Sequence, residues 1–323
     1  MKLASLSHPA GILCTGILRT GILRTAILAA GLLAGGLMAG PRAASAQEVF
    51  ASPEAAANAL VQAASAAEPG FVDRNFGPGA KDLLGSGDEA EDKRRLKAFV
   101  DAANDSRKLD SPNADTRVLV LGSNGWPFPV PLVKRGKGWV FDVEAGREEL
   151  VNRTIGFNEL SAIGACHAYV EAQREFFRQD RDGDDVQEYA QRIISRPGRH
   201  DGLYWPAENP ADRSPLEGQI SADLASRVAA GGKPEPYRGY YFRVLKEQGK
   251  AAPGGAYNYV INGRMIAGFA LVAYPAEWGR TGVMTFICNQ QGKVFQKNLG
   301  PDTARLAAAM TRYNPEAGWT LAE

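Results

Sequence analysis

Residues 158–177 read NELSAIGACHAYVEAQREFF, and this stretch decides the fold that the sequence predicts. Its apolar side chains recur in steps of one and three, which is the spacing of one helical face. At ~100° per residue they form a stripe ~140° wide. The stripe consists of Ala162, Ile163, Cys166, Tyr169, Val170, Gln173, Phe176 and Phe177, of which only Gln173 is polar. We therefore expect a long amphipathic helix that begins near Asn158, a good cap, and buries this face.

The final third of the chain supplies a surface for that face. Short apolar runs separated by turn residues predict antiparallel strands over 239–245, 257–263, 265–273, 282–288 and 293–298. The run GVMTFIC, residues 282–288, is apolar on both parities, which predicts a central strand. A last helix is predicted over 301–313. Residues 154–323 are thus expected to form a domain in which a long helix packs on an antiparallel β-meander.

Residues 47–153 are expected to form a separate α+β domain. Helices are predicted over 52–70, where Ser52 is the cap, and over 85–105, which is acidic first and basic later. Strands are predicted over 116–122, 127–135 and 138–143, and residues 147–153 suit a short connecting helix. The fold class predicted for the whole chain is α+β: N-terminal helices plus a small antiparallel sheet, then the helix-on-meander domain.

Residues 1–46 have the order of a signal peptide. The first acidic residue is Glu48, and residues 25–40, TAILAAGLLAGGLMAG, contain no charge. An A-x-A cleavage site follows at residues 44–46, so Gln47 is the expected mature N-terminus. The alternative is an uncleaved membrane anchor, but a span needs about 20 apolar residues. We expect cleavage and a periplasmic or secreted protein that has no membrane span afterwards.

Composition narrows the expected partners. Removing the leader removes four cationic residues and changes the net charge from +1 to −3. No basic patch interleaves with aromatic residues, so no nucleic-acid partner is expected. Two cysteines remain, Cys166 and Cys288. In an exported chain an even pair is compatible with a disulfide, and two buried free thiols are the alternative.

The stretch DRDGDDVQEYA, residues 180–190, is the densest group of carboxylates. Asp180, Asp182 and Asp184 occupy positions 1, 3 and 5 of a calcium loop, and Glu188 occupies position 9. Asp185 replaces the glycine of an EF-hand, so a complete EF-hand is excluded and a shorter DxDxD calcium site is the candidate. The alternative, to which we give more weight, is a solvated turn between elements.

The stretch RHDGLYWP, residues 199–206, is the second candidate site. His200 and Asp201 suit a base and its orienting group, and Tyr204 and Trp205 suit a stacking platform for a ligand. The more ordinary interpretation, which we favour, is an aromatic corner that anchors a long loop. No nucleophile elbow, zinc-protease helix, C-x-x-C pair or phosphate loop is present.

Several segments together carry a resemblance to known proteins. NELSAIGACHAYVEAQREFF, DRDGDDVQEYAQ, DGLYWP and AYPAEWGRTGVMTFICNQQGKVFQKNLG resemble a bacterial exported family known only as domain of unknown function two-nine-five-zero. GWPFPVPLVKRGKGWVFD extends the resemblance upstream, over nearly all of the mature chain. The family implies no established activity.

Residues 157–300 also look like the soluble part of type IV pilin-like proteins. The order NExxAIxxxxxYxxAQ, then YA, GYYFRV and AYPxxxGxTGVxxF, implies one helix lying on a meander. A pilin needs an apolar helix continuous with this one, whereas residues 47–153 precede it here, so the resemblance implies the fold and not assembly into a fibre.

The sequence therefore predicts a cell-envelope protein that binds an envelope protein or a glycan without catalysis, and calcium at residues 180–188 is a candidate stabiliser of it. The alternative is an envelope hydrolase that uses His200 and the carboxylates.

Overall fold

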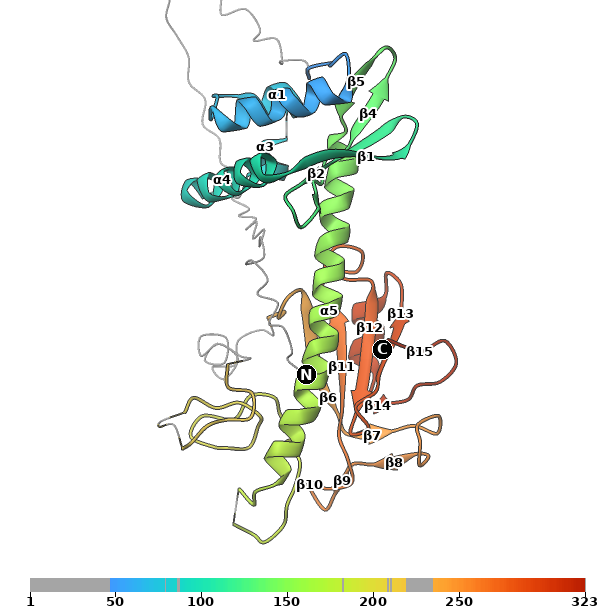
Figure 1. The fold of residues 1–323 in the computed structure, drawn as a ribbon. Helices are drawn as coiled ribbons and strands as arrows, with labels where there is room; N and C mark the ends of the chain where they lie inside the picture. Colours follow the sequence, from blue (N-terminus) through green and yellow to red (C-terminus); the bar gives the residue numbers. More distant parts are fainter. Residues whose placement is uncertain are drawn as a thin grey trace, which may run out of the picture. The chain divides into compact units, whose positions relative to one another are not determined.

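The structure is a computed structural model that describes residues 47–78, 80–85, 88–181, 183–207, 209, 211–218 and 235–322. It divides the chain into two compact units, Met1–Glu149 and Leu150–Glu323. Both units combine helices with antiparallel strands, which confirms the predicted α+β class (Figure 1). The predicted leader, residues 1–46, lies outside the described residues.

The first unit places four helices before its strands within the described range. The helices are α1 (Pro53–Ser65), α2 (Phe71–Phe76), α3 (Lys81–Leu84) and α4 (Glu89–Asp105). The strands are β1 (Arg107–Asn113), β2 (Thr116–Leu121), β3 (Trp126–Pro127), β4 (Leu132–Arg135) and β5 (Gly138–Phe141). They pair in the antiparallel order β1-β2-β4-β5, and β3 pairs with β2.

Local chemistry explains where these helices begin. The Ser52 side chain accepts a hydrogen bond from the N–H of Ala55 at 3.1 Å, which confirms the predicted cap of α1. Asp88 caps α4 in the same way. Strand β1 was not predicted, because its RKLDSPN sequence is exposed at nearly every position and lacks an apolar alternation.

The core of the first unit lies between α1 and the sheet. Leu60 of α1 and Phe141 of β5 are almost fully buried in it, and Phe76 of α2 packs on Phe141 with ring centroids 4.8 Å apart. These apolar contacts hold the helices to the sheet.

Helix α5 (Val143–Phe177) begins fifteen residues before the predicted start. The side chain of Asp142 accepts a hydrogen bond from the N–H of Ala145 at 3.1 Å, which is the contact of an N-terminal cap. The prediction of Asn158 as the cap is therefore wrong, and the predicted short helix over 147–153 is part of the same element. Asn158 is buried, and its amide donates to the carbonyl of Thr281 at 2.9 Å.

The second unit is built on one antiparallel meander. Its strands are β6 (Tyr240–Leu245), β11 (Ala270–Pro275), β12 (Met284–Asn289), β13 (Val294–Asn298) and β15 (Thr320–Leu321). Within the described residues their order is β15-β13-β12-β11-β6. The predicted central strand is confirmed, because β12 lies between β11 and β13.

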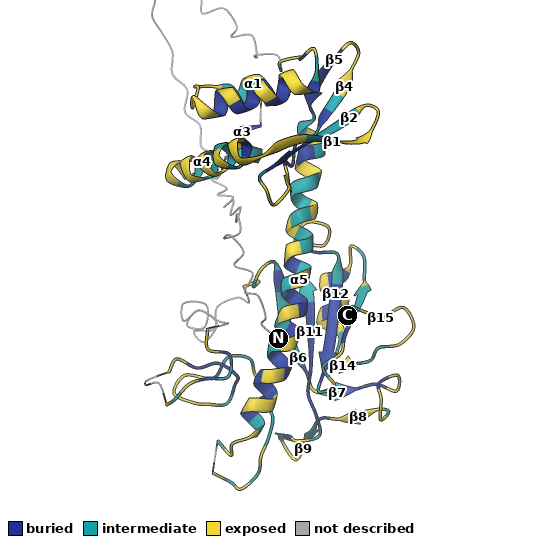
Figure 2. Ribbon diagram, in the orientation of Figure 1, coloured by how far each residue is buried: buried dark blue, intermediate teal, exposed yellow. Residues whose placement is uncertain are grey.

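The apolar stripe of α5 packs on this meander. Figure 2 shows buried residues in dark blue both along α5 and in the strands of the meander. Tyr169 is 3% exposed, and its hydroxyl donates to the carbonyl of Ala270 in β11 at 3.2 Å. Glu159 accepts hydrogen bonds from the N–H groups of Val283 and Met284 at the start of β12. The predicted burial of the stripe is confirmed, with Phe177 half-buried and stacked on Tyr189.

Short elements complete the second unit. They are β7 (Glu247–Gln248), β8 (Tyr257–Asn258), β9 (Val260–Ile261), β10 (Arg264–Met265), α7 (Thr303–Ala309) and β14 (Arg312–Tyr313). Strands β14, β7 and β8 form a small sheet, and β9 pairs with β10. Two predicted strands are each broken in two, and the last helix is shorter than predicted. Gly268 lies in the break before β11, and its φ is +146°. Only glycine fits at this position, because a Cβ there would lie 2.9 Å from the Tyr259 ring.

Candidate functional site

The acidic stretch directly after α5 forms a tight turn. The Asp180 carboxylate accepts hydrogen bonds from the N–H groups of Gly183 at 2.9 Å and Asp185 at 2.8 Å. Gly183 and Asp185 both have positive φ, which such a turn requires. Asp182 lies outside the described residues. Asp180 therefore binds the backbone of its own loop.

The other two predicted calcium ligands are Asp184 and Glu188. One Asp184 oxygen accepts from the N–H of Val186 at 3.0 Å, and the other forms an ion pair with Arg264 of β10. Glu188 is half-buried. Among the described residues, no group of three His, Cys, Asp or Glu side chains is arranged to hold a metal ion. The calcium site stays a prediction.

The segment RHDGLYWP lies in a corner built from backbone pairing. Tyr204 forms an isolated parallel bridge with Ile194, and the N–H of Ser195 donates to the Tyr204 carbonyl at 2.8 Å. Gly202 fits against this backbone, since a Cβ there would lie 2.7 Å from the nitrogen of Ser195. The side chain of Tyr204 is buried with the core of the second unit. This corner fixes the loop that follows α5.

Asp201 is held by arginines. Its carboxylate accepts hydrogen bonds from the Arg196 backbone N–H at 2.8 Å and from Arg196 Nε at 2.5 Å, and Arg192 Nε lies 3.7 Å away. Partial burial acts to raise the pKa of Asp201, but the contacts with Arg196 and Arg192 outweigh it and lower the pKa. Asp201 is thus an ionised anchor of the loop.

His200 lies against Trp205 and not against Asp201. The two rings are stacked with centroids 4.4 Å apart, and His200 Nε2 lies 3.5 Å from the Asp212 carboxylate. Trp205 is 3% exposed, and its indole N–H donates to the Asp212 carbonyl at 2.9 Å. The Arg181 guanidinium lies 5.0 Å from the Trp205 ring centroid. The indole is therefore covered by its own chain, and a ligand role for this corner stays a prediction.

The two cysteines of the second unit are free thiols in the core. Cys288 Sγ lies 3.8 Å from the backbone carbonyl of Cys166, which joins β12 to α5. Burial raises the pKa of the Cys288 thiol well above its usual value, and the neighbouring Cys166 raises it further. A neutral buried thiol is a poor nucleophile, so these residues act as core.

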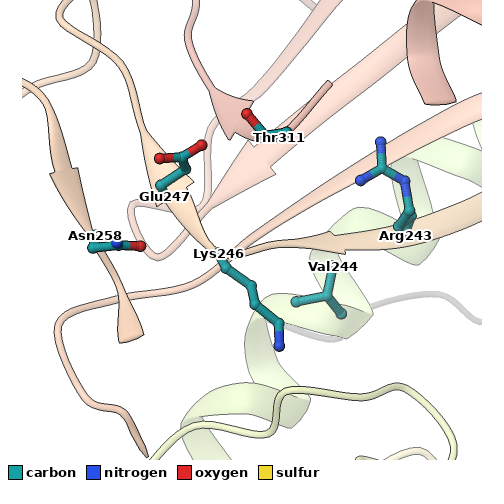
Figure 3. Close-up of a pocket in the computed structure, with 6 residues that line it drawn as sticks. All are labelled: Arg243, Val244, Lys246, Glu247, Asn258 and Thr311. Carbon is teal, nitrogen blue, oxygen red and sulfur yellow. The ribbon is translucent and has the colours of Figure 1, made fainter. Parts of the chain in front are cut away.

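A surface groove of about 470 Å³ lies at the end of β6, away from the predicted sites. Its lining comes from β6, β7, β8 and the residue before β14, as Figure 3 shows. The lining residues are Arg243, Val244, Lys246, Glu247, Asn258 and Thr311. We call this hollow the β6 groove. It is open, its lining combines charged, polar and apolar groups, and no histidine, cysteine or aromatic ring lines it.

The charged groups of the β6 groove have defined positions. Arg243 Nη2 donates to the carbonyls of Ala307 at 2.5 Å and Met310 at 2.7 Å, where α7 ends. Lys246 is exposed, and its Nζ donates to Gln191 Oε1 at 2.9 Å. Glu247 lies 3.6 Å from an Arg312 guanidinium nitrogen. The lining thus carries two cations and one carboxylate, and Arg312 already offsets the charge of that carboxylate, so the groove is electropositive.

The β6 groove was not predicted from the sequence. Arg243 and Lys246 lie three positions apart in YYFRVLKE. This pattern indicates only a strand that contains polar positions. Strand pairing in the small sheet brings Asn258 and Thr311 close to these two residues. No local sequence pattern predicts that pairing. The one local signal was the pair of cations at the end of a run that begins with apolar and aromatic residues.

The second unit is therefore a helix on an antiparallel meander that carries a groove with charged side chains beside its last strand, β6. Residues 47–322 match the model of the family described as Protein of unknown function (DUF2950). The chain belongs to that family, as its motifs predicted. Searches among curated proteins and among solved structures each found no match. Among the described residues, no helix has the length and apolarity needed to cross a bilayer.

Proposed function

We propose that this chain is an exported, non-catalytic binding module of the bacterial cell envelope, which holds a partner in the β6 groove. The groove is the observation that carries the proposal. It combines a volume of about 470 Å³ with cations whose positions hydrogen bonds fix. The leader-like residues 1–46 support export, either to the periplasm or out of the cell.

The chemistry of the groove favours a protein partner over a glycan. Its lining offers charges, an amide and a hydroxyl, which match the polar groups of a peptide chain. It contains no aromatic face of the kind that packs against a flat apolar ligand surface. We therefore take an envelope protein as the partner.

Binding without catalysis also fits the positions of the reactive side chains. A hydrolase needs a base and its orienting carboxylate to converge in one hollow. His200 lies flat on Trp205, and the Asp201 carboxylate is bound to Arg196. None of these residues lines the β6 groove.

A photo-crosslinking experiment tests the proposal. The residue Asn258, exposed in the groove, is replaced by a photoreactive amino acid, and exposed Asn113 of the first unit is the matched control. After irradiation of intact cells, we expect one discrete adduct with Asn258 in the envelope fraction and none with Asn113. The substitution Lys246→Glu in the groove should abolish the adduct. Equal labelling at both positions, no adduct at Asn258, or recovery of the protein in the cytosol would contradict the proposal.

A further inference from the structure

Strand β6 lies at an edge of the meander. Among the described strands its only neighbour is β11, in a register that runs from Tyr240↔Pro275 to Leu245↔Ala270. An edge strand presents backbone N–H and C=O groups that another strand can pair with. The question is which of these groups are free.

The register identifies the backbone groups that point outward. The N–H of Ala276 donates to the carbonyl of Gly239 at 2.9 Å, one step before the first strand pair. Hydrogen-bonded pairs alternate along an antiparallel ladder. The backbone N–H and C=O groups that point to β11 are therefore those of Tyr241, Arg243 and Leu245. The N–H and C=O groups of the residues between them point away from β11.

The chain itself covers both ends of this outward row. Tyr240 exchanges two backbone hydrogen bonds with Tyr237, at 2.9 and 3.0 Å. At the other end, the carbonyl of Lys246 accepts from the N–H of Tyr259 at 2.8 Å. Phe242 and Val244 lie between these points, and their outward backbone groups have no partner in the described part of the chain. Two N–H and two C=O groups are thus open.

The open backbone groups lie beside the electropositive groove. Val244 and Arg243 of β6 line the groove, and so does Lys246 directly after the strand, as Figure 3 shows. Phe242 and Val244 are half-buried, so an incoming strand would cover apolar surface as well. The Arg243 guanidinium binds neutral carbonyls at the end of α7, so these hydrogen bonds do not offset its positive charge.

We propose that an extended acidic peptide segment of a partner protein adds to β6 as a short extra strand and places a carboxylate in the groove. Strand addition obtains affinity from backbone hydrogen bonds and specificity from the side-chain surroundings. The charge of the groove selects an acidic segment over a basic one. This inference rests on the proposed function and names the kind of partner and its mode of binding.

Fluorescence anisotropy with a defined probe tests the inference. The probe is a labelled nonapeptide of alternating Val and Thr that carries two Glu, and a second peptide carries two Lys instead. The key variant is Val244→Pro, which removes one outward N–H and leaves the ladder to β11 intact. We expect Val244→Pro to weaken binding of the acidic probe about tenfold, and the control Val244→Ala to weaken it no more than about twofold. The Lys peptide should bind at least about tenfold more weakly than the Glu peptide.

A probe with N-methyl groups on its pairing edge tests the same hydrogen bonds on the unaltered protein, so the test stands even if Val244→Pro fails to fold. Equal binding of methylated and unmethylated probes, or no binding of the acidic probe, would overturn strand addition. A dimer in sedimentation runs that Val244→Pro abolishes would show that a second copy occupies the edge, which also overturns the inference. If the Asn258 adduct persists without peptide binding, the proposed function stands and only the mode of binding fails.

Discussion

Gln173 is the one polar residue in the apolar stripe of α5, and replacing it should destabilise the second unit. Its side chain is fully buried. The amide nitrogen donates to the Tyr169 hydroxyl at 3.0 Å and to the Ala190 carbonyl at 2.7 Å, and the amide oxygen accepts from the Ala190 N–H at 2.8 Å. The Gln173 amide therefore pairs with both backbone groups of Ala190, as a neighbouring strand would.

The substitution Gln173→Leu removes all three hydrogen bonds at similar volume. It leaves two backbone groups of Ala190 buried and unpaired, at about 1–3 kcal/mol each. The added apolar side chain offsets roughly 1 kcal/mol. We expect a net loss of about 3 kcal/mol in the free energy of unfolding, which at about 2–4 °C per kcal/mol lowers the melting temperature by about 6–12 °C.

Urea denaturation followed by tryptophan fluorescence measures this loss, and hydrogen exchange at the Ala190 amide reports it locally. Gln179→Leu is the matched control, because Gln179 is exposed just after α5 and should change stability by less than about 0.5 kcal/mol. If Gln173→Leu unfolds at the same urea concentration as the wild type and Ala190 stays protected from exchange, the assigned role of Gln173 is wrong.

Three further outcomes follow from the site. Gly202→Ala should lower the free energy of unfolding by about 2 kcal/mol in thermal melts, because its Cβ would meet the backbone nitrogen of Ser195 at 2.7 Å; an unchanged melt would refute this packing. Because the pKa of Asp201 is lowered, its ionised form stabilises the folded state above pH ~4, and this contribution disappears as pH falls through the lowered pKa. Asp201→Asn should thus be less stable than wild type at pH 7 and equal to it in acid, whereas a constant gap would argue against the arginine contacts. A maleimide should modify Cys166 and Cys288 only after unfolding, as mass spectrometry can show, and rapid modification of the native protein would contradict their burial.

The sequence predicted the elements whose apolar spacing is regular. The stripe that includes Cys166 and Tyr169 lies on the meander as expected, and the doubly apolar run GVMTFIC became its central strand. The start of α5 was mispredicted because Asp142 and Asn158 both have side chains that cap helices, and only tertiary contacts show that Asn158 binds Thr281 instead.

The candidate sites were harder to predict than the fold. The carboxylates of residues 180–188 look alike in sequence, but Asp184 is paired with Arg264, far along the chain. His200 and Asp201 are neighbours, yet their side chains contact Trp205 and Arg196. Local patterns carry no information about such long-range partners, and the β6 groove depends on them entirely.

The short open stretch of β6 also bears on solubility. A long bare edge lets identical chains stack into aggregates. Here Tyr237 and Tyr259 already bind the backbone on either side of Phe242 and Val244, so an approaching strand can pair with only the short stretch between them. The cations beside this stretch repel an identical copy. The open stretch of β6 is thus long enough to pair with one short peptide segment and too short to start the aggregation of identical chains.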